Sequence, residues 1–472
     1  MNSGLIETDI RGRILADGVP PLVAEAFLRS VRRWTAGDLG VIPGASLAPI
    51  GSLSRLEELD ELNPAGEAAI ARTVLIKLNG GLGTSMGLER AKSLIIAKNG
   101  LSFLDVIVRQ VEFLRRRCRA PLPLLLMNSF STEADSLAAL AERHPGFANA
   151  GGLPLSFCQH RVPKLELATG APVRWPVQPA LEWCPPGHAD IYHALQTTGL
   201  LDRLLARGFR YAFVSNADNL GALLHMGILA HVAVHRIPFL MEVTARTESD
   251  RKGGHLARSR ETGRLLLRES AQCPAGETAD FQNVEKYDLF NTNNLWLDLE
   301  ALRDMLSACG GLPELPLIVN RKTVDPVRAD SPAVVQLEAA MGSAISCFEN
   351  AAALVVPRFR FAPVKTTNDL LAIRSDLYTL GEEHQVALHP WRFTPPPDIV
   401  LDPRFYKNIA DFELRFPKGA PSLLQCESLK IDGDVRFGAN VRIEGAVHLR
   451  NPTALAARIA DGTRLHTPVS PA

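Results

Sequence analysis

The chain lacks three features that identify membrane, nucleic-acid-binding and exported proteins: long apolar runs, an excess of one charge and an export signal. In its 472 residues, no apolar run approaches the roughly 18 residues of a membrane-spanning helix. Its 51 basic residues balance 51 acidic ones. We therefore expect neither a membrane span nor a polyanionic partner such as nucleic acid. The N-terminus carries Glu7, Asp9, Arg11 and Arg13 where a secretory signal needs an apolar core, so no export signal is expected.

Cysteine is also scarce and scattered. The seven cysteines are odd in number and never form a Cys-x-x-Cys pair; they are Cys118, Cys158, Cys184, Cys273, Cys309, Cys347 and Cys426. This distribution favours reduced thiols over a disulfide framework or a zinc site. The sequence therefore predicts a soluble protein in the cytoplasm.

The length of the chain predicts more than one domain, because it exceeds one ordinary hydrophobic core. Residues 1–70 read as a helical segment in which Val23, Phe27 and Val31 fall on one face. In residues 71–390, short apolar runs alternate with helix-like segments. That rhythm predicts an α/β fold, a Rossmann-like domain with a mixed, mainly parallel sheet. Ligands of such sheets lie beyond the carboxyl ends of the strands.

Residues 391–472 show a different pattern, an apolar residue at every sixth position. The pattern is carried by Leu429, Val435, Val441 and Val447, with Gly433 and Gly445 at the corners. A six-residue period is typical of a parallel β-helix. An antiparallel meander of short strands is the alternative. With so few repeats, we expect this domain to lean on the rest of the chain or on a second copy, which makes it a candidate surface for a homo-oligomer.

The most informative segment is a glycine-rich loop that follows an apolar strand. Residues 74–76 lead into Leu78-Asn79-Gly80-Gly81-Leu82-Gly83, and Lys92 follows. Backbone N–H groups of such a loop, with one mobile ammonium group, can surround phosphates. The loop is not a Walker A motif, because Ala91 precedes the lysine, and Met86 replaces the third glycine of a dinucleotide fingerprint. We therefore predict nucleotide binding; a turn that merely links a strand to a helix is the alternative.

Further segments downstream match the pattern of one enzyme family. The matching segments are 77–84, 157–159, 185–188, 214–222, 252–254, 290–296, 336–338 and 363–370. On these residues the chain resembles the eukaryotic-type UTP:glucose-1-phosphate uridylyltransferases, also called UDP-glucose pyrophosphorylases. The resemblance implies a GT-A-like catalytic domain, a left-handed β-helix at the C-terminus, and Mg²⁺ as cofactor. The implied reaction is reversible and joins UTP and glucose 1-phosphate into UDP-glucose and pyrophosphate.

The resemblance also assigns roles to residues. Lys92 and Lys365 are the implied catalytic lysines, and Asp218 is the implied metal ligand. The implied nucleotide-binding residues are Leu78, Asn79, Gly80, Gly81, Lys92, Gln159, Gly187, Asp218 and Lys365. The implied residues for the sugar phosphate are His188, Asn216, Ala217, Asp218 and Asn293. Lys252 and Lys322 rank lower, because lysines in surface loops are common.

The residue types suit these roles. A carboxylate at a strand end, as at Asp218, is a hard oxygen ligand for Mg²⁺. The amide of Gln159 can donate and accept hydrogen bonds at once, as uracil requires. Lys365 precedes Thr367-Asn368, which we expect to cap a helix, so its ammonium group and the helix N-terminus face the same anion.

One segment departs from the family pattern, and two other functions stay open. The family reads Gly-Cys-x-Gly-Pro-Lys where this chain has Gly87-Leu88-Glu89-Arg90-Ala91-Lys92. Loss of the Gly-Pro pair changes the stiffness of the loop and adds two charges near the phosphates. A broader UDP-sugar pyrophosphorylase is one alternative, because few hydrogen bonds distinguish epimeric sugars. A non-catalytic sugar-nucleotide-binding scaffold is the other.

Overall fold

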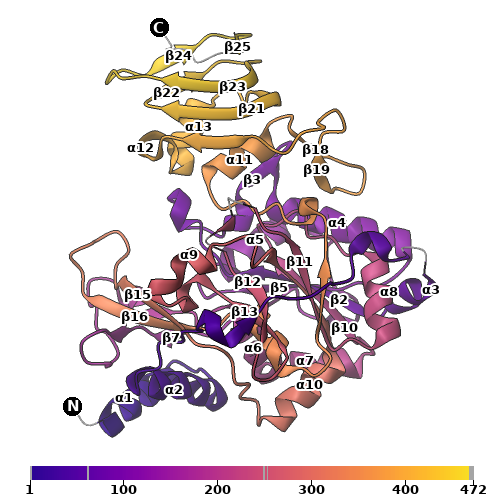
Figure 1. Cartoon of the computed structure of the whole chain (residues 1–472), viewed down its shortest axis with the longest axis vertical. Helices are drawn as coiled ribbons and strands as arrows, with labels where there is room; N and C mark the ends of the chain where they lie inside the picture. The colour runs from indigo at the N-terminus through magenta and orange to yellow at the C-terminus, as the bar shows by residue number, and fades with distance from the viewer. Residues whose placement is uncertain (1–2, 61–62, 248–249, 252, 467–472) are drawn as a thin grey trace.

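Residues 3–60, 63–247, 250–251 and 253–466 are described by a computed structural model. A large sheet with helices on both faces lies at the centre of the molecule (Figure 1). The C-terminal strands, yellow in Figure 1, form a tier at one end, and the two N-terminal helices lie at the other end. Within the described residues, no helix combines the length and the apolar character needed to cross a bilayer.

The central sheet runs through seven strands in spatial order, and three more strands pair beside this path. The path is β1 (Leu47–Ala48), β12 (His255–Ser259), β14 (Leu289–Asp298), β10 (Tyr211–Asn216), β2 (Thr73–Asn79), β5 (Leu124–Asn128) and β6 (Ser156–Cys158). The strands beside it are β11 (Phe239–Ala245), β13 (Leu265–Arg268) and β17 (Ala352–Val355).

The sheet is mixed, as predicted, but parallel pairs do not predominate in it. The run β10–β2–β5–β6 is parallel, and so is the pair β11–β17. Strand β14 is antiparallel to β10, β11 and β12, and β12 is antiparallel to β1 and β13. Strands β12 and β13 form a hairpin, and a short hairpin loop joins only antiparallel strands. The parallel strands are those whose ends carry the glycine loop and Asp218.

Successive side chains of β2 point to opposite faces of the sheet and so enter two different cores. Leu75 belongs to the core on one face of the sheet, whereas Val74 and Ile76 belong to the core on the other face. The first core is covered by α3 (Pro64–Ile70), α4 (Phe103–Cys118) and α8 (Met226–His235). The second core is covered by α6 (Ile191–Thr197), α7 (Leu200–Ala206) and α10 (Leu299–Ala308). The strand is buried on both faces, which explains its nearly continuous apolar sequence.

The N-terminal helices pack on a small second sheet rather than on the central one. These elements are α1 (Ser3–Ala16), α2 (Pro21–Thr35), β8 (Leu165–Glu166), β15 (Ile318–Thr323) and β16 (Ala333–Glu338). Val23, Phe27 and Val31 of α2 are all buried against this sheet. The predicted apolar face of the helix is therefore confirmed.

The C-terminal strands are parallel, which excludes the antiparallel meander. One sheet holds β20 (Asp398–Leu401), β21 (Ser422–Asp432), β23 (Arg442–Arg450) and β25 (Arg464–Leu465), and a second holds β22 (Val435–Phe437) and β24 (Ala457–Ile459). All four apolar residues of the six-residue pattern are buried. Their core is continuous with the core of the central sheet that contains α4 and α8, so this tier leans on the rest of the chain as expected.

Shorter elements complete the chain. The remaining strands are β3 (Ile96–Lys98), β4 (Leu101–Ser102), β7 (Val162–Pro163), β9 (Trp183–Cys184), β18 (Tyr378–Leu380) and β19 (Val386–Leu388). The remaining helices are α5 (Glu133–Arg143), α9 (Thr278–Phe281), α11 (Thr367–Arg374), α12 (Pro403–Tyr406) and α13 (Ile409–Arg415).

Candidate active site

The glycine-rich loop closes on itself. Strand β2 ends at Asn79, and the chain returns so that the N–H group of Lys92 donates to the carbonyl of Gly81 at 3.2 Å. Leu82 and Ala91 form an antiparallel bridge one step further out. These main-chain contacts return Lys92 to the end of β2.

Lys92, Asp218 and Lys365 meet just beyond the carboxyl end of β10. One oxygen of Asp218, Oδ2, accepts hydrogen bonds from Lys92 Nζ at 2.7 Å and from Lys365 Nζ at 2.9 Å. The side chains of Lys92 and Asp218 are each 13% exposed, and that of Lys365 is 56% exposed. Burial raises the pKa of Asp218, but the two ammonium groups outweigh it and lower the pKa overall. Asp218 is therefore ionised at neutral pH.

Main-chain pairing brings Lys365 to this carboxylate. The carbonyl of Asp218 accepts from the N–H group of Val364 at 3.1 Å, and Asn219 bridges to Pro363. Helix α11 starts at Thr367, and its cap is Thr366, which directly follows Lys365 and lies one residue earlier than expected. The cap lies there because the Asp369 carboxylate reaches back to the N–H group of Thr366 at 2.8 Å.

Gly80 and Gln159 lie side by side. A Cβ atom on Gly80 would come within 2.5 Å of Gln159 Nε2, so glycine here lets the amide lie against the backbone of the loop. Gln159 follows β6, and its N–H group donates to the carbonyl of Asn128 at 2.8 Å. Next to Gly80, Gly81 borders open space. The loop and the amide therefore meet at the ends of the parallel strands β2 and β6.

Leu78 and Asn79, the two residues before the loop, make different contacts. Leu78 pairs with Asn216 across β2 and β10, and its carbonyl accepts from the N–H group of Ala217 at 3.0 Å. The side chain of Asn79 is buried instead, where it donates to Asn128 Oδ1 at 2.7 Å and to Ser136 Oγ at 2.8 Å. The amide of Asn79 thus serves the core, and its backbone alone borders the loop.

His188 is held in one tautomer. Its Nδ1 accepts a hydrogen bond from the N–H group of Met341 at 2.9 Å, so the ring proton lies on Nε2. Burial, with a further contribution from the Lys365 ammonium group, lowers the pKa of His188 to about 4. The preceding Gly187 has φ +89°, and a Cβ atom there would meet the carbonyl of Ala339 at 2.4 Å. This corner therefore requires glycine and presents a neutral N–H donor at neutral pH.

Two other predicted residues, Asn293 and Lys322, make contacts of their own. Asn293 occupies a bulge of β14 with φ +58°, where Asn291 Nδ2 donates to its Oδ1 at 3.0 Å. Among the described residues, no hydrogen bond joins Asn293 to Lys92, Asp218 or Lys365. Lys322 lies on β15 and donates to Gln336 Oε1 at 2.8 Å. Lys252 lies outside the described residues.

A charged network beneath the site was not predicted. The Glu242 carboxylate in β11 is fully buried and accepts hydrogen bonds from the guanidinium group of Arg360. Lys77 in β2 is also buried and donates to Ser215 Oγ at 2.7 Å and to the carbonyl of Ala222 at 2.9 Å. The available signal was a charged residue inside each of two apolar strands, because such a residue needs a buried partner.

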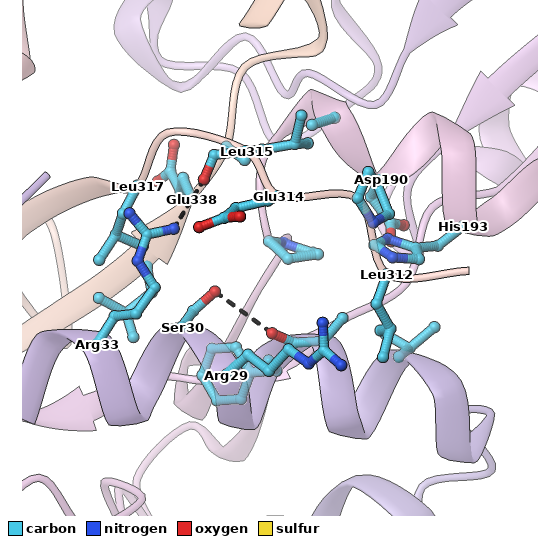
Figure 2. Close-up of a pocket in the computed structure, with 18 of the residues that line it drawn as sticks. Arg29, Ser30, Arg33, Asp190, His193, Leu312, Glu314, Leu315, Leu317 and Glu338 are labelled. Carbon is cyan, nitrogen blue, oxygen red and sulfur yellow. Dashed lines mark hydrogen bonds and ion pairs between the residues drawn. The ribbon is translucent and has the colours of Figure 1, made fainter. Parts of the chain in front are cut away.

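A cavity of about 630 Å³ lies between α2 and residues 309–317. Figure 2 shows Arg33 of α2 reaching Leu315, whose carbonyl accepts from Arg33 Nη1 at 2.8 Å. The cavity touches Pro186, Ala189 and Ala339 but takes in none of Lys92, His188, Asp218 or Lys365. It is therefore a neighbour of the segment that carries His188, separate from the lysine–aspartate cluster.

Comparisons with known proteins agree on one family. The family model described as UTP–glucose-1-phosphate uridylyltransferase matches residues 43–444. The enzyme of that name from Solanum tuberosum is 40% identical over 443 residues, which are 92% of this chain and 90% of the relative. A variant of the UDP-glucose pyrophosphorylase from Leishmania major, solved in complex with UDP-glucose, is 42% identical, with a TM-score of 0.92 and 99% of each chain covered.

A second structure extends this agreement. The UDP-glucose phosphorylase from Trypanosoma brucei is 42% identical, with a TM-score of 0.91, 98% of this chain and 99% of that chain covered. Together with the family model, which covers most of the chain, these relatives show that the protein belongs to the UTP–glucose-1-phosphate uridylyltransferase family.

Proposed function

We propose that the protein transfers the uridylyl group of UTP to α-D-glucose 1-phosphate, forming UDP-glucose and pyrophosphate in a reversible reaction. One observation carries the proposal for this chain. Two ammonium groups from distant segments meet on one carboxylate oxygen beside the glycine-rich loop. The relatives named above are enzymes of this activity, and one of them is seen with UDP-glucose.

The chemistry needs alignment and positive charge more than covalent help. A phosphate oxygen of glucose 1-phosphate attacks the α-phosphorus of UTP, and the bond from that phosphorus to the pyrophosphate oxygen breaks. Lys92 and Lys365 neutralise the phosphate charge that shifts during this exchange. Both ammonium groups are paired with Asp218. Phosphate oxygens compete with Asp218 for them, so the pairing holds the two positive charges together where the triphosphate binds.

The remaining predicted residues divide between base and sugar. The position beside Gly80 and Gln159 suits uracil, with Leu78, Asn79, Gly81 and Gly187 supplying backbone around it. The neutral Nε2–H donor of His188 suits an oxygen of the sugar phosphate. Asn216 and Ala217 precede Asp218, and Asn293 supplies an amide for a sugar hydroxyl. These assignments rest on the family resemblance together with the contacts described above.

We also propose Asp218 as the ligand of Mg²⁺. Its Oδ1 is buried and makes no hydrogen bond in the described structure, so it keeps its lone pairs while Oδ2 is engaged. Nowhere in the described residues do three or more His, Cys, Asp or Glu side chains gather for a metal. This donor set fits Mg²⁺, which is commonly held by one carboxylate, phosphate oxygens and water. When bound, the ion would neutralise part of the triphosphate charge.

Replacement of this carboxylate tests the metal proposal. We expect Asp218→Asn to raise the Mg²⁺ concentration for half-maximal rate by about tenfold, since one charged ligand is lost. The control is Asp105→Asn, another buried, ion-paired aspartate on a different element. An Mg²⁺ titration that is unchanged in a folded Asp218→Asn variant would remove Asp218 from the metal site.

Release of pyrophosphate tests the reaction itself. We expect release with UTP and glucose 1-phosphate, and far less when ATP replaces UTP or galactose 1-phosphate replaces the glucose form. Equal turnover of the two sugar phosphates would favour the broader UDP-sugar pyrophosphorylase. No release with any pair would favour the non-catalytic scaffold.

The domain organisation is part of the same proposal. We assign residues 1–70 to an N-terminal helical segment, 71–390 to the catalytic domain and 391–472 to a left-handed parallel β-helix. The parallel pairing of Leu429 with Val447, three six-residue steps apart, supports a coil of three sides. Strand β1, from the first segment, pairs with β12 of the catalytic sheet. The light-scattering mass of the whole chain, compared with 51.4 kDa for one copy, tests whether the protein forms a homo-oligomer.

A cytoplasmic location stays a prediction. All seven cysteines are unpaired, which agrees with a reducing compartment. Fractionation of cells that produce the protein tests this directly.

A further inference from the structure

The segment that carries Lys365 is anchored in a buried ion pair. Glu242 is fully buried in β11, and its carboxylate accepts from Arg360 Nε at 2.8 Å and from Arg360 Nη2 at 2.6 Å. Trp296 Nε1 and Asn294 Nδ2 donate to the same carboxylate at 2.9 and 3.0 Å. Arg360 is only 2% exposed and also donates to the carbonyl of Leu223 at 2.8 Å. A buried charge with so many partners is a rigid anchor, because moving it would leave charged groups unpaired.

One side chain joins this anchor to the turn that carries Asp218. Asn219 Nδ2 donates to the carbonyl of Arg360 at 3.1 Å, and Asn219 Oδ1 accepts from the N–H group of Ala362 at 3.0 Å. The same Oδ1 accepts from the N–H group of Gly221 at 3.2 Å. The Asn219 amide therefore links the main chain of the 219–221 turn to the main chain of residues 360–362.

Lys365 depends on this fastening more than its partner lysine does. Its side chain is more than half exposed, and a long exposed side chain samples many positions unless its backbone is held. The chain from Ala362 to Lys365 runs along Asp218 and Asn219 through the Val364–Asp218 hydrogen bond and the Asn219–Pro363 bridge. The direction in which the ammonium group approaches a phosphate is thus set at Asn219, within the buried layer.

We infer that Asn219 is a positioning residue, which acts on the uridylyl transfer by holding the 360–365 segment where Lys365 reaches the phosphates. Asn219 is itself 2% exposed and hydrogen-bonded within the protein on both ends of its amide, so it acts through Lys365 rather than by touching substrate. The inference rests on the proposed function, since it assigns a role within that reaction.

A double-mutant cycle on turnover separates positioning from ordinary stability. Loss of an orienting contact lowers kcat strongly, so we expect Asn219→Ala to lower kcat about 30-fold with little change in KM for UTP. In a Lys365→Ala background, where the positioned group is gone, the same substitution should lower kcat less than about threefold.

The chain offers a matched control in Asn149. This asparagine is also buried and also makes four side-chain hydrogen bonds, two of them to the backbone of Leu124 in β5, away from the site. We expect Asn149→Ala to lower the melting temperature about as much as Asn219→Ala, but to leave kcat within about twofold of wild type.

A second variant perturbs the same contact from the other side, in case Asn219→Ala fails to fold. A Cβ atom on Gly221 would lie 2.3 Å from the carbonyl oxygen of Phe359, so Gly221→Ala should push the 359–362 segment away and give the same pattern in the cycle. Equal losses of kcat in the wild-type and Lys365→Ala backgrounds, or a loss matched by Asn149→Ala, would overturn the inference. A folded wild-type protein without turnover would overturn the proposed function. The double-mutant cycle on an active wild type overturns the inference alone, so the two failures can be told apart.

Discussion

Lys92 and Lys365 reach the same oxygen of Asp218 from two regions that are built in different ways. The loop before Lys92 is closed by its own main chain, through the Lys92–Gly81 hydrogen bond and the Leu82–Ala91 bridge. The segment before Lys365 is held by side chains from other parts of the chain, above all by Glu242 in β11 and by Asn219 in the turn after β10. One charge is placed by local structure and the other by tertiary structure.

The difference also appears in how each lysine meets solvent. The Lys92 side chain is 13% exposed, whereas that of Lys365 is 56% exposed. Water and salt screen an exposed charge more than a buried one, and an exposed lysine loses more freedom when it is held in place. Lys92 should therefore contribute more to the transition state, and Lys365 should be more sensitive to its surroundings.

Removal of the buried ammonium group should have the largest effect. We expect Lys92→Ala to lower kcat about 1,000-fold, equivalent to about 4 kcal/mol of transition-state stabilisation. A coupled pyrophosphate assay measures it, and circular dichroism checks the fold. The control is Lys430→Ala, which removes a half-exposed lysine on β21 and should change kcat little. A loss below tenfold for Lys92→Ala would contradict its catalytic role.

The exposed lysine should matter less. We expect Lys365→Ala to lower kcat about 100-fold, because its charge is more strongly screened by solvent. The same assay applies, at low and at moderate salt, and the wild-type contribution of Lys365 should shrink with added salt. If Lys365→Ala lowers kcat more than Lys92→Ala does, solvent exposure does not decide how much each ammonium group contributes to the rate.

The local build of the Lys92 loop is open to a separate test. Gly87 has φ +70°, and a Cβ atom there would meet Asn408 Oδ1 at 2.7 Å. Either the loop or the Asn408 side chain must give way in Gly87→Ala; we expect the loop to shift, to move Lys92 with it and so to lower kcat about tenfold. Gly100→Ala is the control, since Gly100 has φ +76° but open space around its Cα. Both variants carry the same backbone strain, so equal kcat values would show that the loop geometry does not position Lys92.

Periodic features of this molecule could be predicted from the sequence, and pairings between distant charges could not. The buried face of α2 and the six-residue pattern of the C-terminal strands follow from side-chain spacing alone. The antiparallel course of β14 does not, because apolar alternation carries no information about strand direction. Likewise, Glu242 in an apolar strand indicates that a buried partner exists, but the identity of that partner, Arg360, depends on which segments pack together.

The candidate site divides along the same line. Lys92 could be placed beside the glycines because it follows them closely in the chain, and Lys365 and Asp218 came from the family resemblance. The contacts that hold these residues in place join segments that are distant in the sequence. Asn219 belongs to a matched segment, yet nothing in that segment shows that its amide binds the main chain of residues 360 and 362.

Lys77 lies beneath the turn on which both lysine-bearing regions meet. Its Nζ donates to Ser215 Oγ and to the carbonyl of Ala222, on either side of that turn. Burial, with a contribution from the positive charge of Arg360, lowers the pKa of Lys77 from 10.5 to about 7. Two acceptors match the two N–H bonds of a neutral amine, which is the form that this site favours at alkaline pH.

This pKa predicts a pH dependence of stability with a definite sign. Between pH 7 and about 10.5 the unfolded chain holds a proton on Lys77 that the folded protein has released, so the free energy of unfolding should rise with pH. Below pH 7 both states are protonated, and the cost of burying the ammonium group is present in full. In Lys77→Met this dependence should vanish. As pH rises, the free energy of unfolding of wild type should therefore increase relative to that of the variant by at most about 1.4 kcal/mol per pH unit. Urea unfolding from pH 6.5 to 9 measures the difference, with Lys430→Met as the exposed control; parallel curves for wild type and Lys77→Met would mean that Lys77 keeps its charge in the fold.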